Sequence, residues 1–151
     1  MRRRLRKIEG RDIRFYGTSY ANMASFFETT HRVEFCETDM AGIVHFSNFY
    51  KWMEQAEHEF FRSLGLTIVN PQTNGATIGW PRVSANCRFE SPAKYGDVLA
   101  VKLMLQRIGV KSLTYDVYFS IDDRSVARGT MKTVCCTISH GEGLKSVEIP
   151  E

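Results

Sequence analysis

Three side chains between residues 39 and 47 are of types that support acid–base or nucleophilic chemistry: Asp39, His45 and Ser47. Together they have the composition of a hydrolase triad, but no G-x-S-x-G turn surrounds the serine, which disfavours that interpretation. Asp39 also has a purely structural alternative, because an aspartate shortly before a glycine often caps a turn. The residues alone leave both roles of Asp39 open.

A second pair, Glu54 and His58, has the i, i+4 spacing that could place two metal ligands on one helical face. No third ligand follows at a suitable spacing, so we expect a solvent-facing helix pair and no metal site. The four cysteines contain no C-x-x-C pair and indicate reduced thiols rather than a zinc site or a disulfide framework. We therefore expect neither a metal nor another cofactor.

The elements that must position these residues begin with a strand, a loop and one long helix. Alternation of polar and apolar residues predicts a strand over 31–35, and turn-forming residues predict a loop over 37–42. Apolar residues then recur at helical spacing, from a cap at Ser47 or Asn48 to a stop at Gly65. The apolar stripe consists of Phe49, Trp52, Met53, Ala56, Phe60 and Leu64.

Strand patterns dominate the rest of the chain. A long loop rich in Pro, Asn and Gly follows the helix, and four strands are then expected, as a meander, at 80–89, 98–107, 113–119 and 125–138. One long apolar helix with one antiparallel sheet is an α+β architecture, in which the sheet must curve around the helix. The length fits one domain, which we place at residues 29–151 after an extension at 1–28.

The extension is basic: five of the first seven residues are Arg or Lys, while the whole chain has a formal net charge of +3. Such a segment could be an arm for nucleic acid, a membrane-surface arm or a targeting segment, but we interpret it as a solvated tail. No apolar h-region follows it, and no run of about 18 apolar residues occurs. We expect a cytoplasmic protein with no nucleic-acid or membrane partner.

The chain resembles the hotdog-fold thioesterases, in particular the 4-hydroxybenzoyl-CoA thioesterase family, over about residues 30–138. The resemblance rests on HRVEFCETDMAGIVHFSNFYKWMEQAEHEFFRSLGL and, less specifically, on CRFESPAKYGDVLAVKLMLQRIGVKSLTYDVYF. The family pattern is an aromatic strand end, D-x-x-G-(I/V)-V, a small polar pair, an aromatic and a helical acidic residue. It is matched by Phe35, Asp39, Gly42, Ile43, Val44, Ser47, Asn48, Phe49 and Glu54.

The resemblance implies a hotdog fold, a curved antiparallel sheet around one central helix, and hydrolysis of a thioester. Asp39 would act as nucleophile or as general base for water. The backbone N–H of Phe46, at the N-terminus of the helix, would donate to the carbonyl oxygen as negative charge develops there. Gly42 would permit the tight loop between them. His45 could orient water, pair with Asp39 or have no chemical role.

The implied substrate is an acyl- or aryl-CoA thioester, although a carrier-protein thioester is also possible. Glu54 stands where an acidic residue recognises a ring hydroxyl in aryl-CoA relatives, but it is longer than Asp, so the acyl group stays open. The expected substrate contacts are Glu54, Asn48, Trp52, Arg88, Lys111 and Ser112, with Lys94 as a further candidate for the CoA phosphates. Each basic residue could equally be solvated, and the helical aromatics could be plain core.

The resemblance further implies a homodimer or homotetramer with its sites at subunit interfaces. Two other functions stay open from the sequence. One is a non-catalytic hotdog protein that binds acyl-CoA, and the other is a hotdog hydratase or dehydratase. No additional acid–base motif suited to hydration of an alkene is present.

Overall fold

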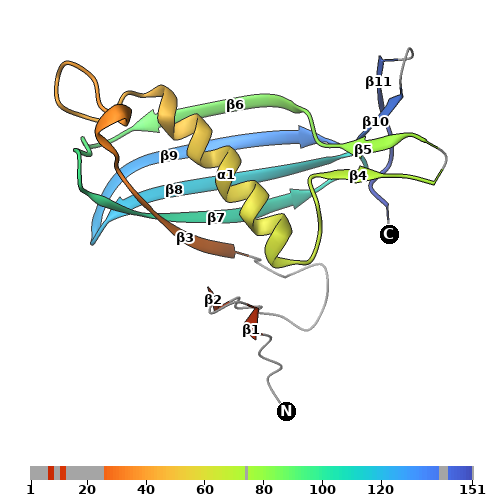
Figure 1. The fold of residues 1–151 in the computed structure, drawn as a ribbon, viewed down its shortest axis with the longest axis horizontal. Helices are drawn as coiled ribbons and strands as arrows, with labels where there is room; N and C mark the ends of the chain where they lie inside the picture. Colours follow the sequence, from red (N-terminus) through yellow and green to blue (C-terminus); the bar gives the residue numbers. More distant parts are fainter. Residues whose placement is uncertain (1–6, 9–10, 13–25, 74, 140–142, 151) are drawn as a thin grey trace.

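One long helix, α1 (Ser47–Ser63), crosses the face of a five-stranded antiparallel sheet (Figure 1). The structure is a computed structural model, and it describes residues 7–8, 11–12, 26–73, 75–139 and 143–150. One helix packed on an antiparallel sheet is the α+β architecture that the sequence predicted.

The sheet has the order β3 (Phe26–Arg32), β7 (Val98–Ile108), β8 (Ser112–Ile121), β9 (Arg124–Val134) and β6 (Arg82–Phe89). Strands β7, β8 and β9 form a meander, as expected. Strand β6, however, pairs with β9 rather than with β7, so the expected meander of four consecutive strands is wrong. The chain between β6 and β7 instead runs along the end of the sheet, past β9 and β8, so that β7 lies between β8 and β3.

A second, four-stranded sheet lies at the far end of the molecule, in the order β11 (Gly143–Ser146), β10 (Cys136–Ser139), β5 (Thr77–Gly79) and β4 (Val69–Pro71). The region expected to be a long loop thus contains two short strands. The strand expected over 125–138 is divided at Cys135, because the Cys135 N–H bonds to the Lys111 carbonyl and its own carbonyl accepts from Val147. The four cysteines form no disulfide with one another in the structure.

The first strand of the large sheet begins earlier and ends earlier than the pattern predicted. Strand β3 starts at Phe26 and pairs with β7 as far as Arg32, so its first three residues fall inside the expected extension. Residues Phe35–Glu37 form a 3-10 turn, η2, instead of the end of a strand. Within the extension, β1 (Lys7–Ile8) pairs with β2 (Arg11–Asp12), and residues 1–6, 9–10 and 13–25 lie outside the described ones.

The helix begins at Ser47, with Phe46 as its N-cap in helical geometry and without a side-chain cap. The expected cap at Ser47 or Asn48 is therefore wrong by one or two residues. The C-terminal stop at Gly65 is confirmed: Gly65 has φ +75°, and Leu66 and Gly65 donate to the Phe61 and Arg62 carbonyls in a Schellman motif. No helix in the described part of the chain is long and apolar enough to cross a membrane.

The core lies between the helix and the sheet. The strict alternation over 113–119 is confirmed, because Leu113, Tyr115, Val117 and Phe119 are all buried. They pack with apolar residues of the helix and of the other strands, among them Phe49, Trp52, Met53, Ala56, Phe60, Leu99, Val101, Leu103, Val126 and Met131. One helical carboxylate outside the apolar stripe, Glu57, is also fully buried.

Candidate active site

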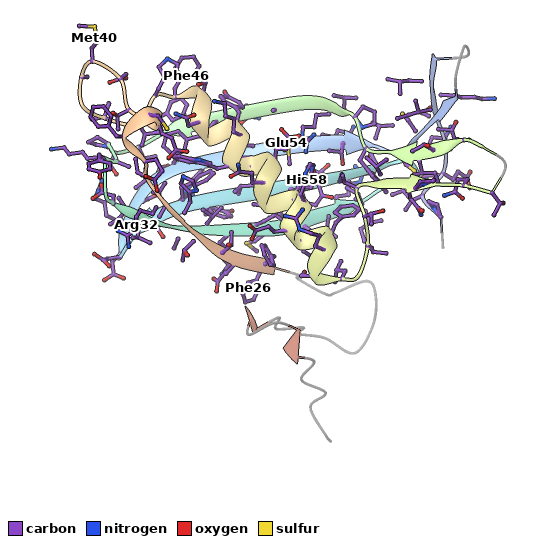
Figure 2. The ribbon with its side chains drawn as sticks, viewed as in Figure 1. Phe26, Arg32, Met40, Phe46, Glu54 and His58 are labelled. Atoms are coloured by element: carbon purple, nitrogen blue, oxygen red, sulfur yellow. The ribbon has the colours of Figure 1, made fainter. Side chains whose placement is uncertain are left out.

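A pocket of about 460 Å³ opens beside the N-terminal end of α1. Its lining residues are Asp39, Ile43, Val44, Phe46, Phe49, Phe89, Glu90, Ser91, Pro92 and Ala93. Figure 2 shows Phe46 at this end of the helix, next to the loop that carries Met40. The pocket is mostly apolar, and two carboxylates contribute to its wall.

The loop on one side of the pocket is a small antiparallel hairpin. The His45 N–H donates to the Glu37 carbonyl at 2.9 Å, Thr38 and Val44 form a β-bridge, and the Asp39 N–H donates to the Ile43 carbonyl at 2.9 Å. The hairpin therefore fixes Asp39 near its tip in register with the residues that lead into the helix.

Gly42 closes the tip of this hairpin. Its N–H donates to the Asp39 carbonyl at 2.9 Å, and its φ of +72° lies in the left-handed region. An added Cβ would meet nothing within 4 Å, so backbone conformation, rather than space, favours glycine here. The predicted tight loop at Gly42 is confirmed.

The Asp39 side chain caps the same turn. One carboxylate oxygen, Oδ1, accepts a hydrogen bond from the Ala41 N–H at 2.8 Å, and the residue is exposed. This is the structural role that an aspartate before a glycine suggests. Within the described residues Oδ2 has no partner, so one oxygen holds the carboxylate in place while the other is available for chemistry.

The backbone N–H of Phe46 has no acceptor among the described residues. The preceding N–H, of His45, is bound to Glu37, and the following one, of Ser47, lies 3.4 Å from His45 Nδ1. Phe46 already has helical dihedral angles, φ −52° and ψ −32°, so its N–H belongs to the donor end of the helix. Such a free donor, together with the helix dipole, suits an oxygen that acquires negative charge.

The opposite wall of the pocket is the segment after β6. The N–H groups of Glu90 and Ser91 both donate to the Val126 carbonyl, at 2.8 and 3.1 Å. The Ala93 carbonyl accepts from the Val44 N–H at 2.8 Å, which ties this wall to the hairpin. Both walls are therefore held by backbone hydrogen bonds.

Sequence reasoning missed Glu90 and Phe89 as pocket residues. The Glu90 carboxylate lies 3.5 Å from Arg128 Nε. Phe89 is 47% exposed, and its ring lies 5.3 Å from that of Phe49 and 6.4 Å from that of Phe46. The only available signal was their place directly before the Ser-Pro-Ala segment. The three rings give the pocket an aromatic wall.

Two of the residues expected at the substrate lie inside the chain instead. Asn48 is 6% exposed; its amide donates to the Glu37 carbonyl at 2.8 Å and accepts from Lys51 Nζ at 3.2 Å. Trp52 is 2% exposed, and its Nε1–H donates to Glu37 Oε1 at 3.1 Å. Neither lines the pocket, and a role for either in substrate binding stays a prediction.

His45 and Glu54 also have partners other than those first considered. His45 Nδ1 lies 2.8 Å from Ser47 Oγ, while Asp39 bonds to its own turn, so the described contacts do not form a triad. Farther along the helix, Arg82 Nη1 lies 3.2 Å from Glu54 Oε1, and Arg82 Nη2 lies 3.3 Å from His58 Nε2. Within the described residues, no group of three or more potential metal ligands occurs.

The basic candidates are spread over the molecule. Arg88 is exposed on β6, opposite Arg128, and Lys94 follows the last lining residue of the pocket. Lys111 and Ser112 stand at the start of β8, whose other end lies near the pocket. Ten residues of strand span about 30 Å, so one chain does not bring Lys111 and Ser112 to Asp39.

Comparison with known proteins gives consistent results. Residues 33–151 match the model of the thioesterase-like superfamily. A putative esterase of Aquifex aeolicus (strain VF5) is 33% identical over 120 residues, 80% of this chain and 88% of that protein. The 4-hydroxybenzoyl-CoA thioesterase of Pseudomonas sp. (strain CBS-3) is 29% identical over 140 residues, 85% and 94% of the two chains. The structure of a gentisyl-coenzyme A thioesterase matches with a TM-score of 0.71 at 30% identity, covering 83% of this chain and 97% of that one.

Proposed function

We propose that this chain, which belongs to the thioesterase-like superfamily, hydrolyses an acyl- or aryl-CoA thioester to the free acid and CoA. Membership of the family and the hotdog α+β fold are confirmed. One observation carries the proposal for the site: Asp39 and Phe46 line one pocket, and the Phe46 N–H has no acceptor in the described part of the chain.

In the proposed reaction, Asp39 acts at the carbonyl carbon, either by direct attack or by taking a proton from an attacking water. The Phe46 N–H stabilises the charge on the carbonyl oxygen, an interaction typically worth about 3 kcal/mol of activation free energy. The carbon–sulfur bond then breaks, and the CoA sulfur leaves and takes up a proton. Direct attack would form a mixed anhydride on Asp39, which water hydrolyses to the acid.

A single turnover in H₂¹⁸O tests for direct attack. If water then opens the anhydride at the carboxyl carbon of Asp39, the first product carries an oxygen of Asp39, and the label enters the protein. Label in the acid in the first turnover fits general base catalysis, or attack of water on the acyl carbon of the anhydride.

The aromatic wall of Phe46, Phe49 and Phe89 supports an aryl group as the acyl part. Two relatives are named for aryl thioesters, 4-hydroxybenzoyl-CoA and gentisyl-coenzyme A. We therefore rank aryl-CoA esters above aliphatic ones. Glu54 does not line this pocket and lies beside Arg82 farther along the helix, so its contact with a polar group on the ring rests on the family resemblance alone.

A homo-oligomer would complete the site. Lys111 and Ser112 are too far from Asp39 in one chain, but a second copy could bring its own pair to the pocket, near the CoA phosphates. Strand β6 supports this proposal because it pairs on one side only, with β9, among the described strands, and it is largely exposed. Sedimentation equilibrium tests it: a monomer at the concentration of the assay would contradict it.

A panel of aryl- and acyl-CoA esters, followed by thiol release, tests the proposed function. We expect turnover of at least one aryl-CoA ester, with unchanged rates after EDTA treatment because the proposed mechanism uses no metal. Binding across the panel without thiol release would contradict hydrolysis and indicate an acyl-CoA-binding protein. Hydration of crotonyl-CoA without thiol release would indicate a hydratase.

A further inference from the structure

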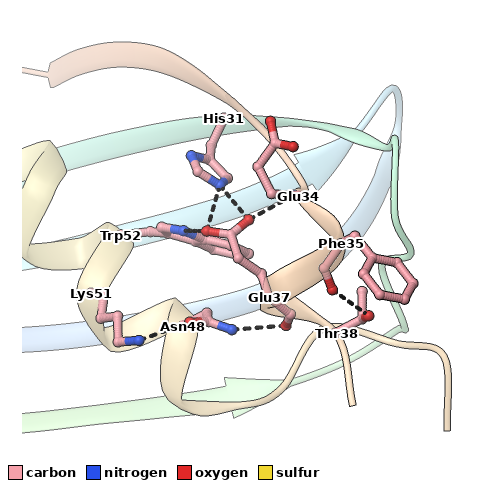
Figure 3. A network of polar contacts seen from close by, with 8 residues as sticks. All are labelled: His31, Glu34, Phe35, Glu37, Thr38, Asn48, Lys51 and Trp52. Carbon is pink, nitrogen blue, oxygen red and sulfur yellow. Dashed lines mark hydrogen bonds and ion pairs between the residues drawn. The ribbon is translucent and has the colours of Figure 1, made fainter. Parts of the chain in front are cut away.

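Glu37, two residues before Asp39, is bound from three directions through its side chain (Figure 3). Its carboxylate oxygens lie 2.9 and 3.1 Å from His31 Nε2 on β3. Oε1 accepts from the indole N–H of Trp52 on α1 at 3.1 Å, and Oε2 accepts from the Glu34 N–H at 2.8 Å. The carboxylate therefore connects the edge strand, the 3-10 turn and the helix.

The backbone carbonyl of Glu37 is bound as well. It accepts from the His45 N–H at 2.9 Å and from the Asn48 side-chain amide at 2.8 Å. The first bond closes the base of the hairpin that carries Asp39, and the second attaches that base to the first turn of α1. His45 directly precedes Phe46. The Glu37 carbonyl therefore joins the strand that leads to Asp39 to the strand that leads to the Phe46 N–H.

The surroundings of the Glu37 carboxylate favour its charged form. The side chain is 17% exposed, and burial alone raises its pKa, but hydrogen bonds from His31, Glu34 and Trp52 outweigh burial and lower the pKa below its usual value. The His31 ring also packs on the Trp52 indole, with centroids 4.4 Å apart. A neutral side chain of the same size would direct an N–H toward groups that are themselves donors.

We infer that Glu37 is a positioning residue, which holds Asp39 and the Phe46 N–H at a fixed separation. It lies on one strand of the hairpin and bonds to His45 on the other strand, to β3 and to α1. His31 and Trp52 contribute through Glu37, and neither of them lines the pocket. This inference rests on the proposed thioesterase function. The contacts of Glu37 then serve catalysis. A looser hairpin would move Asp39 away from the Phe46 N–H, although both groups would still be present.

The test uses Glu37→Gln in the full chain, with the best CoA ester of the panel as substrate. We expect kcat per folded site to fall on the order of 10- to 100-fold, because displacements of about 1 Å at reacting groups have effects of this size. KM should stay within about twofold, since the pocket walls remain. Glu28→Gln, the same loss of charge in an exposed pair of β3 with Lys102 at 3.6 Å, serves as the matched control and should change neither value.

Smaller changes at two other residues keep the inference testable if Glu37→Gln does not fold. Trp52→Phe removes the indole donor and part of a buried ring. His31→Gln keeps an N–H near the position of Nε2, whereas His31→Ala removes it. We expect kcat to decrease from the parent to His31→Gln and again to His31→Ala. Because His31 and Trp52 both act through Glu37, a double variant that combines His31→Ala with Trp52→Phe should lose less kcat than the product of the two single losses. A purely structural role would lower the unfolding temperature and leave kcat per folded site unchanged in all of them.

The outcomes separate this inference from the proposed function. If no ester is hydrolysed, or if Asp39→Asn is as active as the parent, the proposed function or its mechanism is wrong. If the parent is active, Asp39→Asn is inactive and the folded Glu37, His31 and Trp52 variants keep the kcat of the parent, then Glu37 does not position the site.

Discussion

Arg82 Nη2 donates to Glu57 Oε2 over 2.6 Å, so a guanidinium at the start of β6 reaches a carboxylate that is fully buried beneath α1. The other oxygen of Glu57 has no partner among the described residues, and neither do the buried hydroxyls of Tyr115 and Thr133. Burial raises the pKa of Glu57 to about 7, although Arg82 acts to lower it.

This raised pKa predicts a pH-dependent stability. The folded state binds a proton on Glu57 more tightly than the unfolded chain does, because the pKa of this carboxyl in the unfolded chain is near 4.5. The stabilising contribution is thus complete below pH 4.5 and is lost as pH rises to about 7. At about 1.4 kcal/mol for each tenfold change in proton affinity, the loss is roughly 3 kcal/mol.

Urea unfolding of the parent and of Glu57→Gln at pH 4.5 and pH 8 measures this loss. Between these two pH values, the free energy of unfolding should fall less in Glu57→Gln than in the parent, whatever the absolute stability of the variant. The neighbouring His58 has a lowered pKa, mainly from burial and then from Arg82, and contributes with opposite sign, so the comparison between the two proteins is decisive. Equal changes in both would contradict the assignment.

Asp39→Asn keeps the size of the side chain and its ability to accept from the Ala41 N–H, but it removes the charge. We expect kcat to fall by at least about 100-fold, the usual contribution of a catalytic base or nucleophile, with little change in unfolding temperature. The asparagine variant retains the turn cap, so it separates catalysis from structure. A variant as active as the parent would leave Asp39 with its structural role only.

Gly42→Ala tests the conformation of the hairpin tip. A Cβ at φ +72° costs about 1–2 kcal/mol, although it meets no neighbour, so the chain should be less stable and the hairpin less well fixed. Gly42→Asn is the matched control, because asparagine tolerates the left-handed region better. We expect activity in the order parent, Gly42→Asn, Gly42→Ala. Equal activity of the two variants would exclude backbone strain as the cause.

The features that the sequence predicted are those with local causes. Gly65 ends the helix because its left-handed conformation allows the Schellman hydrogen bonds within one turn. The buried side of 113–119 follows from the two-residue period of a strand. The loop at Asp39 and Gly42 likewise depends on the turn itself and on a family motif of adjacent residues.

The features that the sequence did not predict depend on partners far along the chain. Strand β6 pairs with β9, about 45 residues later, and nothing in its own pattern specifies that neighbour. The burial of Glu57 was not predicted, because its partner, Arg82, lies 25 residues away. Glu90 lies at the pocket because its N–H bonds to the carbonyl of Val126, which is 36 residues later in the chain. The roles of Asp39 and the Phe46 N–H stay predictions.

The separation of Lys111 from Asp39 predicts complementation between chains. If CoA contacts come from a second copy, Lys111→Ala should raise KM, and Asp39→Asn should abolish turnover, when each is purified alone.

Co-expression of the two variants would form mixed dimers in which one site combines an intact Asp39 with an intact Lys111. In each mixed dimer, one of the two sites is complete in both respects, and the other lacks both groups. On tag-separated mixed dimers, the parent's KM should therefore return with about half of the parent's kcat per dimer. If Lys111 instead served the pocket of its own chain, every Asp39-containing site in the mixed dimer would keep the KM of Lys111→Ala. The control uses Lys102→Ala in place of Lys111→Ala: Lys102 is a half-buried lysine on β7, and its loss should not alter KM in either arrangement.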